Sequence, residues 1–321
     1  MVRYLIRRVL WAAALFVVVT MVTYVIFFII PADPAKLACG QRATPACIAL
    51  AADHFGLDDP IYVQYGRFLW RLTYHHDLGR SFVDRQSVNE TVMKAAPVTA
   101  SLVFGGAILW LTLSVPLGIL SALRPRSLLD RVGMLFVLIG ISAHPVWIGL
   151  IFSYVIGYKL GWTPITGYCD FFNPSTDCGG PVQWAYHLIL PWATFAILFA
   201  ALYVRLIRAS VMETVQEDYV RTARAKGASE AVVVKDHVVR NALLPIVTIL
   251  GLDVGAALGG AIFTETIYSL PGLGQTALNS IATFDLPVTM GIVVFGTVCI
   301  IFVNLVVDIL YSVIDPRIRL R

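Results

Sequence analysis

Long apolar runs separated by polar segments are the dominant pattern of this chain. Five runs contain no Asp, Glu, Lys or Arg, and a sixth, Asn241–Thr264, contains one acid, Asp253. Each exceeds the roughly 20 residues that a helix needs to cross about 30 Å of hydrocarbon. The pattern predicts an all-α membrane protein with six transmembrane helices, because buried helices of a soluble protein have shorter runs with polar stripes. The charge-free runs are Val9–Ala32, Ala95–Leu123, Val132–Tyr158, Cys178–Val204 and Leu286–Val307.

Composition and charge support this interpretation and add an orientation. The chain is 58% hydrophobic and 14% charged, whereas soluble domains carry about 25% charged residues. Most lysines and arginines lie at the two ends and in the segments Arg124–Arg131 and Arg205–Arg240, which predicts that both termini are cytoplasmic. The net charge of +4 reflects this topology, and no basic run with interleaved aromatics indicates a nucleic-acid partner. The first apolar run lacks a cleavage site, so residues 1–30 are predicted to form an uncleaved anchor helix.

Three regions are expected along the chain. After the anchor helix, about Val9–Ile30, residues 31–96 form an external loop region. Within it Ile61–Leu72 is predicted to be a helix with one apolar face, formed by Ile61, Tyr65, Phe68 and Leu72. Asp58 or Asp59 is expected to cap this helix, with Pro60 in the first turn. It can lie on the membrane surface or cover the mouth of a pore, and both interpretations stay open.

Residues 97–321 are predicted to form a five-helix core with a cytoplasmic loop at 209–241. Pro145 lies inside the third helix, and the neighbouring His144 is interpreted as a satisfied buried imidazole in preference to a ligand or proton relay. Glycines and prolines after the fifth helix exclude a simple continuation and leave a short helix, about Gly274–Ala282. The five core helices are expected at about Val98–Leu123, Gly133–Tyr158, Trp184–Ile207, Ala242–Phe263 and Val288–Val313.

The cysteines are distributed according to this topology. Cys39 and Cys47 fall in the first external loop, Cys169 and Cys178 in the second, and Cys299 inside the last helix. Two local pairs on the oxidising face predict two small disulfides, with four free thiols as the alternative. No metal is expected, because no histidine lies at ligand spacing beside either pair.

The polar segment Glu213–Pro245 carries most of the functional information. A helix here can approach another surface closely because Ala223 and Ala225 are small, and Gly227 can adopt the left-handed conformation that ends a helix. Ser229 can then cap a second helix, Glu230–Val239. The apolar residues Ala231, Val234 and Val238 are expected on the face of that helix that packs against the bundle. The segment therefore predicts a helix, a sharp turn and a second helix across the cytoplasmic mouth.

This segment resembles the coupling loop of binding-protein-dependent ABC importers, whose motif is Glu-Ala-Ala, three residues and Gly. YVRTARAKGAS followed by RNALLP is most similar to the B-type permease subunit of dipeptide and oligopeptide importers. The similarity extends to FGLDDPIYVQYGRFLWRL and DLGRSF at Phe55–Phe82, to LPGLGQTALNSIATFDLPV at Leu270–Val288, and to NLVVDILYSVIDPRIR at Asn304–Arg319. The chain departs from the motif by reading Arg221, Thr222 and Ala223 at the Glu-Ala-Ala positions.

The resemblance implies a type I ABC importer permease fold and a mechanism. Two permease subunits pair as a heterodimer in the bacterial inner membrane, and two cytoplasmic ATPase subunits or domains each accept one coupling loop. Closure of the ATPases on ATP switches the pore, and an extracytoplasmic binding protein delivers the substrate. ATP and Mg then belong to the partner chains: this chain has no Gly-x4-Gly-Lys-Ser/Thr loop, binds no cofactor and is not itself an enzyme. The coupling residues implied are Tyr219, Arg221, Thr222, Ala223, Ala225, Gly227, Ala228 and Arg240.

Acidic residues inside apolar runs are costly and usually face a cavity or a partner. Asp253 therefore is a candidate pore residue, and a structural hydrogen bond to a neighbouring helix is the alternative. Glu265 and Asp308 lie near helix ends, where water is expected to be close, so neither needs a special role.

Other functions remain open to a lesser degree. The resemblance implies peptides, but relatives that carry haem, nickel chelates or oligosaccharides share the architecture. An ion-coupled secondary transporter would show internal repeats and several embedded ionisable groups, and this chain has one central acid. An intramembrane enzyme would need a motif such as His-Glu-x-x-His or Gly-x-Ser-x-Gly, and neither occurs.

Overall fold

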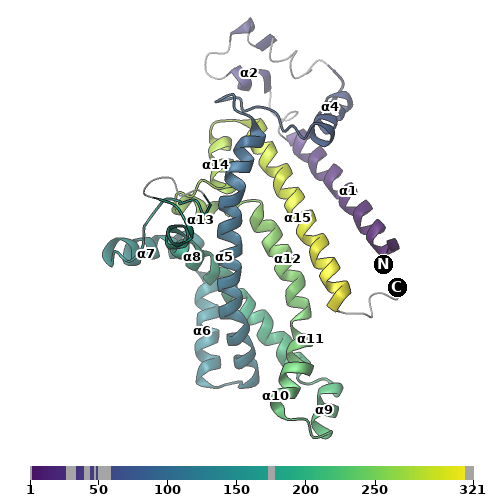
Figure 1. Ribbon diagram of the computed structural model, residues 1–321, viewed down its shortest axis with the longest axis vertical. Coiled ribbons are helices and arrows are strands. Elements are labelled where there is room, and N and C mark those ends of the chain that lie inside the picture. Colours follow the sequence, from purple (N-terminus) through teal and green to yellow (C-terminus); the bar gives the residue numbers. More distant parts are fainter. Residues whose placement is uncertain are drawn as a thin grey trace.

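The protein is mostly helical in the part that the computed structural model describes, residues 2–26, 34–39, 44–46, 48–49, 59–172 and 178–314 (Figure 1). These ranges contain no β-strand. By length and composition, four helices can cross a membrane, and two bent helix pairs bring the number of spans to six if each pair counts as one. The predicted all-α membrane fold is thus confirmed. The four single helices are Ile6–Tyr24, Val88–Leu123, Pro181–Thr214 and Leu286–Val307.

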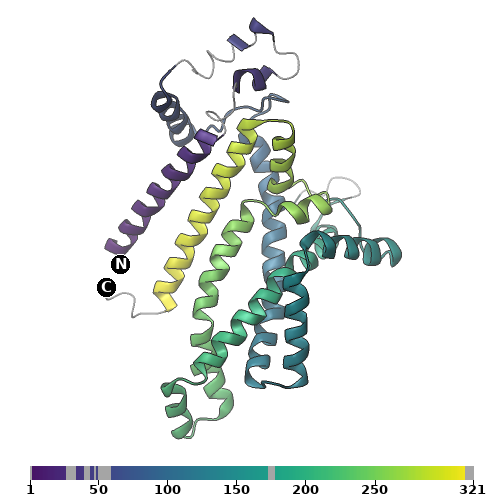
Figure 2. The same ribbon diagram turned by 180° about the vertical axis from the view of Figure 1, so that it is seen from behind.

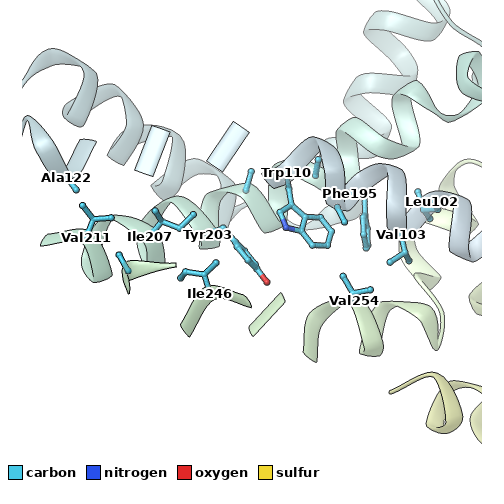
Figure 3. Close-up of a cluster of buried hydrophobic side chains, with 14 of the residues drawn as sticks. Leu102, Val103, Trp110, Ala122, Phe195, Tyr203, Ile207, Val211, Ile246 and Val254 are labelled. Atoms are coloured by element: carbon cyan, nitrogen blue, oxygen red, sulfur yellow. The ribbon is translucent and has the colours of Figure 1, made fainter. Parts of the chain in front are cut away.

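Two long helices, α5 (Val88–Leu123) and α8 (Pro181–Thr214), form the centre of the core. Trp110 on α5 is fully buried beside Phe195 of α8 (Figure 3). It also stacks on Phe199 of α8, with ring centroids 4.6 Å apart. Gly118 permits the close approach of the two helices, because a Cβ there would lie 2.8 Å from Cβ of Ile207. Both helices are longer than their apolar runs predict, since polar residues continue the helix beyond the hydrocarbon-length segment. The first turns of α5 thus fall inside the region assigned to the external loop.

The third predicted span is not one continuous helix. α6 (Leu128–Ser142) ends before Pro145. The segment that α7 (Pro145–Phe152) and the π-helix η3 (Ser153–Lys159) form together lies at an angle of 105° to α6. Proline lacks a backbone N–H and restricts the preceding residue to extended conformations, so the helix stops there. His144 is exposed and caps α7 by accepting a hydrogen bond from the amide of Val146 at 3.3 Å. The expectation of a buried imidazole was therefore wrong.

The fifth predicted span is also divided. The π-helix η4 (Val233–Val239) and α11 (Arg240–Ala242) lead into α12 (Leu244–Leu258), and α13 (Ile262–Ile267) follows as a separate element. Gly260 has φ of +135°, and a Cβ there would lie 2.9 Å from Cα of Gly274. This conformation and close approach require glycine, so the helix expected to reach Phe263 ends before Gly260. α14 (Leu273–Ala282) confirms the predicted short helix.

The first helix, α1 (Val2–Tyr24), lies beside the last, α15 (Leu286–Ile314), at the edge of the molecule (Figures 1 and 2). α1 was expected at about Val9–Ile30, and residues 27–33 lie outside the described residues. The short helix α2 (Pro34–Cys39) follows that gap.

The predicted surface helix is present as α4 (Ile61–Tyr74), which lies across the end of α1 (Figure 1). Phe68 is buried, and its ring centroid is 5.6 Å from that of Tyr24 on α1. Tyr65 and Leu72 are half-buried as expected, but Ile61 at the start of the helix is exposed. The predicted apolar face is therefore correct except at its first residue.

The predicted cap of α4 is wrong. Pro60 occupies the N-cap position, and the side chain of Asp59 pairs with Arg67 at 2.6 Å instead of capping the helix. Asp58 lies outside the described residues.

Candidate functional site

The predicted helix–turn–helix projects from one end of the bundle, beyond the end of α8 (Figures 1 and 2). Its first helix is α9 (Asp218–Ala225), and its second consists of α10 (Glu230–Val232), η4 and α11. Opposite ends of the long helices therefore carry this projection and the surface helix α4.

The turn has the geometry that the sequence predicts. Gly227 adopts φ of +82°, and nothing lies within 4 Å of a Cβ built there, so conformation and not space demands the glycine. The amide of Ala228 donates to the carbonyl of Ala223 at 3.3 Å, which is the six-to-one hydrogen bond of a Schellman motif. The amide of Gly227 donates to the carbonyl of Arg224 at 3.0 Å. Ser229 takes the predicted N-cap position, although its side chain makes no cap hydrogen bond within the described chain.

Apolar side chains anchor the projection in the core. Val220, Val233 and Val238 are fully buried and belong to the same hydrophobic cluster as Val211 on α8. The expected inner face of Ala231, Val234 and Val238 is therefore partly wrong, since Ala231 is exposed. The π-helical winding of η4 places residues five apart above one another, which brings Val233 and Val238 to the same side.

A salt bridge that the sequence analysis did not identify spans the turn. Arg224 donates to Glu230 through Nε at 3.1 Å and through a terminal nitrogen at 2.7 Å. This two-point contact connects the two helices on either side of Gly227. The amide side chain of Asn241 adds a second link by donating to the hydroxyl of Tyr219 at 3.1 Å. Opposite charges that flank a helix-ending glycine are the sequence signal that was overlooked.

The predicted coupling residues do not all share one environment. Ala223 is buried against the core, at 8% exposure, and Ala228 is half-buried. The rest of the set is exposed: Tyr219, Arg221, Thr222, Ala225, Gly227 and Arg240. Most of the predicted set is thus exposed on the projection, while Ala223 is buried and Ala228 is half-buried.

A second polar cluster braces the same end of the bundle. Asp130 is buried at the start of α6 and accepts two hydrogen bonds from Arg208 of α8, at 2.8 and 3.1 Å. It also accepts hydrogen bonds from the hydroxyl of Ser121 on α5 and the amide of Arg126. Three helices are therefore joined through one carboxylate next to the projection.

The candidate pore residue Asp253 lies on α12 and is half-buried. Its carboxylate accepts a hydrogen bond of 2.7 Å from the hydroxyl of Tyr203, whose side chain points toward α12 in Figure 3. Asp253 also lines a mostly apolar cavity of about 320 Å³, together with residues such as Phe199 and Phe263. The two interpretations are compatible, because the same acid bonds to a neighbouring helix and faces a cavity.

Glu265 on α13 contradicts the expectation that water would surround it. The side chain is fully buried and accepts hydrogen bonds from the hydroxyl of Thr99 at 2.7 Å and the amide of Gln275 at 2.9 Å. A Cβ at Gly272 would overlap its carboxyl group. The return of the chain from α13 to α14 encloses Glu265, so its position near a helix end does not bring it close to water. The side chain of Asp308, which was also expected near water, lies outside the described residues.

One of the two predicted disulfides is confirmed. Cys169 and Cys178 are bonded, with their Cα atoms 5.3 Å apart. The other prediction involves Cys47, which lies outside the described residues. A ring nitrogen of His187 on α8 lies 3.2 Å from Sγ of Cys169. The premise that no histidine accompanies a cysteine pair was therefore wrong, because the fold brings one from the next helix.

These features define the class of the protein: it is a multi-span helical membrane protein with a braced helix–turn–helix that projects from one end of its bundle. The chain belongs to the family of binding-protein-dependent transport system inner membrane components, whose model matches residues 114–320. A model of the N-terminal part of such transport system membrane components matches residues 1–103.

Full-length relatives carry names from peptide transport. The chain is 36% identical to the di/tripeptide transport system permease protein DppB of Pseudomonas aeruginosa (strain UCBPP-PA14), over 99% of both chains. It is 35% identical to the dipeptide transport system permease protein DppB of Alkalihalophilus pseudofirmus, covering 99% of this chain and 100% of the relative. It is 34% identical to the dipeptide permease DppB of Escherichia coli (strain K12), over 99% of both chains.

A solved structure supports the fold. The chain resembles an inward-facing structure of the MetNI methionine ABC transporter with a TM-score of 0.55 and 15% sequence identity, over 70% of this chain and 96% of that chain. At this identity the likeness concerns the fold alone, and it confirms the predicted permease fold of an ABC transporter.

Proposed function

We propose that this chain forms half of the membrane pathway of an ATP-driven importer for dipeptides or oligopeptides. The observation that carries this proposal is the α9–η4 projection, which is exposed on one side, anchored in the core on the other and closed by the Gly227 turn. A projection that is anchored in this way can transmit motion to the core, whereas a flexible loop would dissipate it. The three DppB relatives, aligned from end to end, support the choice of peptides.

The exposed side of the projection is the surface on which a partner ATPase acts in this proposal. Tyr219, Arg221, Thr222 and Ala225 are exposed on α9. Arg240 lies on α11, where the second helix turns back toward the membrane. Ala223 and Ala228 allow close packing beneath that surface, so that a push on α9 reaches α8 and α12 through Val220 and Val238.

The proposed assembly contains a second permease subunit, two ATPase subunits or domains and an extracytoplasmic binding protein. Large apolar side chains stay exposed on the bent segment α7–η3, among them Trp147, Ile151 and Tyr158. Lipid and a second permease subunit together account for this apolar surface in the proposal. ATP and Mg bind in the partner ATPases, and both termini of this chain face the cytoplasm with them.

Transport by the reconstituted complex tests the role of the projection. Proline is fixed at φ near −65°, so Gly227→Pro abolishes the turn, and Ala223→Glu places a charge in a buried position. Both variants are expected to insert normally and to lose ATP-coupled uptake. Ala231→Glu is the matched control, because Ala231 is exposed on the same projection. Wild-type uptake by either test variant would refute the proposal, as would ion-driven accumulation by this chain alone.

Identification of the solute tests the choice of substrate separately. The assembled complex is purified with its binding protein, and the bound molecule is identified by mass spectrometry. Peptides are the expected result. Haem or a nickel chelate would move the substrate to another class while leaving the importer mechanism in place.

A further inference from the structure

A cavity of about 650 Å³ lies at the end of the molecule opposite the projection. It is enclosed by the end of α1, by α4, by the segment that leads to α5, and by the start of α15. Its floor is apolar and buried, formed by Tyr24, Phe68, Phe82 and Met290. The cavity is separate from the coupling projection and from the cavity beside Asp253, so the proposed function makes no use of it.

Three exposed arginines line this cavity: Arg71 from α4, and Arg80 and Arg85 from the segment before α5. None of the ion pairs found among residues 59–172 and 178–314 involves any of the three. Asp77 is the acid among the lining residues, and its carboxylate accepts a hydrogen bond from the amide of Gly79 at 2.9 Å. The cavity therefore carries an excess of positive charge above an apolar floor.

A tight hairpin fixes two of these arginines in place. The amide of Val88 donates to the carbonyl of Gly79 at 3.0 Å, and the amide of Ser81 donates to the carbonyl of Gln86 at 2.9 Å. Arg85 adopts φ of +62°, a conformation that residues other than glycine seldom take. The carboxylate of Asp84 accepts a hydrogen bond of 3.1 Å from the amide of Gln86, which holds this acid within the hairpin turn.

The hairpin is in turn fastened to the membrane domain through Asp285, just before α15. Asp285 is buried and accepts hydrogen bonds from the hydroxyl of Ser81 and, at 3.0 Å, from the amide of Phe82. The arginines are thus presented by a scaffold that is already ordered. A ligand that binds them does not have to order the loop, which reduces the entropic cost of binding.

We propose that this cavity binds the phosphate of an anionic phospholipid headgroup. Arginine pairs with phosphate through two parallel hydrogen bonds, and three arginines that lack acidic partners within the described ranges suit a group with several acceptor oxygens. The apolar floor includes Tyr24 at the end of α1, a helix long enough to cross a membrane.

The test measures lipid retention by the full chain with the subunits that copurify with it. The complex is reconstituted in nanodiscs of equal parts phosphatidylcholine and phosphatidylglycerol, transferred to detergent, and examined by native mass spectrometry. The variant carries Arg71→Gln, Arg80→Gln and Arg85→Gln together, and it is expected to retain about tenfold less phosphatidylglycerol than the unmodified complex. Arg67→Gln is the matched control, because Arg67 is also on α4 but pairs with Asp59 and does not line the cavity. Equal thermal stability of the variants establishes that the fold is intact.

Addition of inorganic phosphate distinguishes a site for a lipid headgroup from a site for free phosphate. Retention that resists excess phosphate supports the lipid headgroup, and displacement by phosphate supports a site for free phosphate and overturns the lipid assignment. Equal retention by the triple variant and the control would overturn the site itself. The site would likewise be overturned if the triple variant kept its lipid and instead lost its association with an extracytoplasmic protein.

Discussion

Thr99 and Glu265 are hydrogen-bonded at the centre of the molecule, although 166 positions separate them in the sequence. The Thr99 hydroxyl donates to the Glu265 carboxylate and accepts a hydrogen bond of 2.8 Å from the amide of Leu273. The same carboxylate accepts a hydrogen bond from the amide of Gln275. One hydroxyl and one carboxylate therefore join α5, α13 and α14, and they hold the glycine-rich turn between α13 and α14 in a closed form.

Thr99→Val is expected to weaken this junction. The substitution keeps the shape of the side chain but leaves the buried amide of Leu273 without its acceptor, which costs about 1–3 kcal/mol. The melting temperature of the purified complex measures the effect. Thr112→Val is the control, because Thr112 is exposed on the same helix and bonds only to its own turn. Equal melting temperatures for the two variants would mean that the junction does not stabilise the fold.

The contact between Ser81 and Asp285 predicts a local effect in the hairpin that precedes α5. Asp285→Ala leaves the hydroxyl of Ser81 and the amide of Phe82 without an acceptor in a buried place. A cost of about 1–3 kcal/mol should open the hairpin more often and accelerate its amide exchange roughly ten- to a hundredfold. Hydrogen exchange of the peptide that spans residues 79–88 measures this. Thr283→Ala, at an exposed position nearby, should leave exchange unchanged, and unaltered exchange in the Asp285 variant would contradict the prediction.

The salt bridge between Arg224 and Glu230 is expected to matter for coupling more than for stability. Both side chains are partly exposed, so solvent screens the pair and it contributes little to folding stability. Arg224→Glu should lower the number of solutes carried per ATP several-fold, because the two helices of the projection lose their brace. The double variant with Glu230→Arg should recover much of the loss. Lys235→Gln serves as the exposed control, and a double variant no better than the single one would show that the brace is not the cause.

Two substitutions at the Tyr203–Asp253 contact distinguish a pore function from a structural one. Tyr203→Phe removes the hydrogen bond but retains the carboxylate, whereas Asp253→Asn removes the charge and retains an acceptor. If Asp253 faces the transported solute, Asp253→Asn should reduce the uptake rate about tenfold or more, and Tyr203→Phe should change it much less. Initial rates over a range of solute concentrations provide the measurement. Unchanged affinity and rate in Asp253→Asn would leave Asp253 with a structural role only.

The Cys169–Cys178 disulfide joins residues nine positions apart. Its loss in the Cys169→Ser, Cys178→Ser double variant should destabilise the protein by about 2–3 kcal/mol. Thermal unfolding with and without reductant checks this value. Thiol counting on native protein checks the bond itself, and free thiols at both positions before reduction would contradict it.

The spans and the projection could be predicted from sequence because each follows from local chemistry. Apolar runs of membrane length identified all six candidate spans. Gly227 identified the turn, because glycine can adopt the left-handed conformation that ends a helix. Local rules also explain the two errors in continuity. Pro145 and Gly260 were visible in the sequence, but the apolar runs around them continue without interruption, so hydropathy alone joined what the backbone separates.

The buried contacts could not be predicted in the same way. Glu265 meets Thr99, and Cys169 meets His187, only because distant segments pack together, and one sequence contains no direct signal of such pairs. The π-helical winding of η4 similarly changed which valines face the core. Glu265 was assigned to solvent because it lies near a helix end. Ala231 was assigned to the inner face because sequence spacing assumes a regular helix.

The position of α1 beside α15 has a consequence for biogenesis. α1 is synthesised well before α15, which is its main neighbour in the described part of the structure. Until α15 is synthesised, α1 must therefore remain stable in lipid without that neighbour. The many exposed apolar residues of α1 suit this condition.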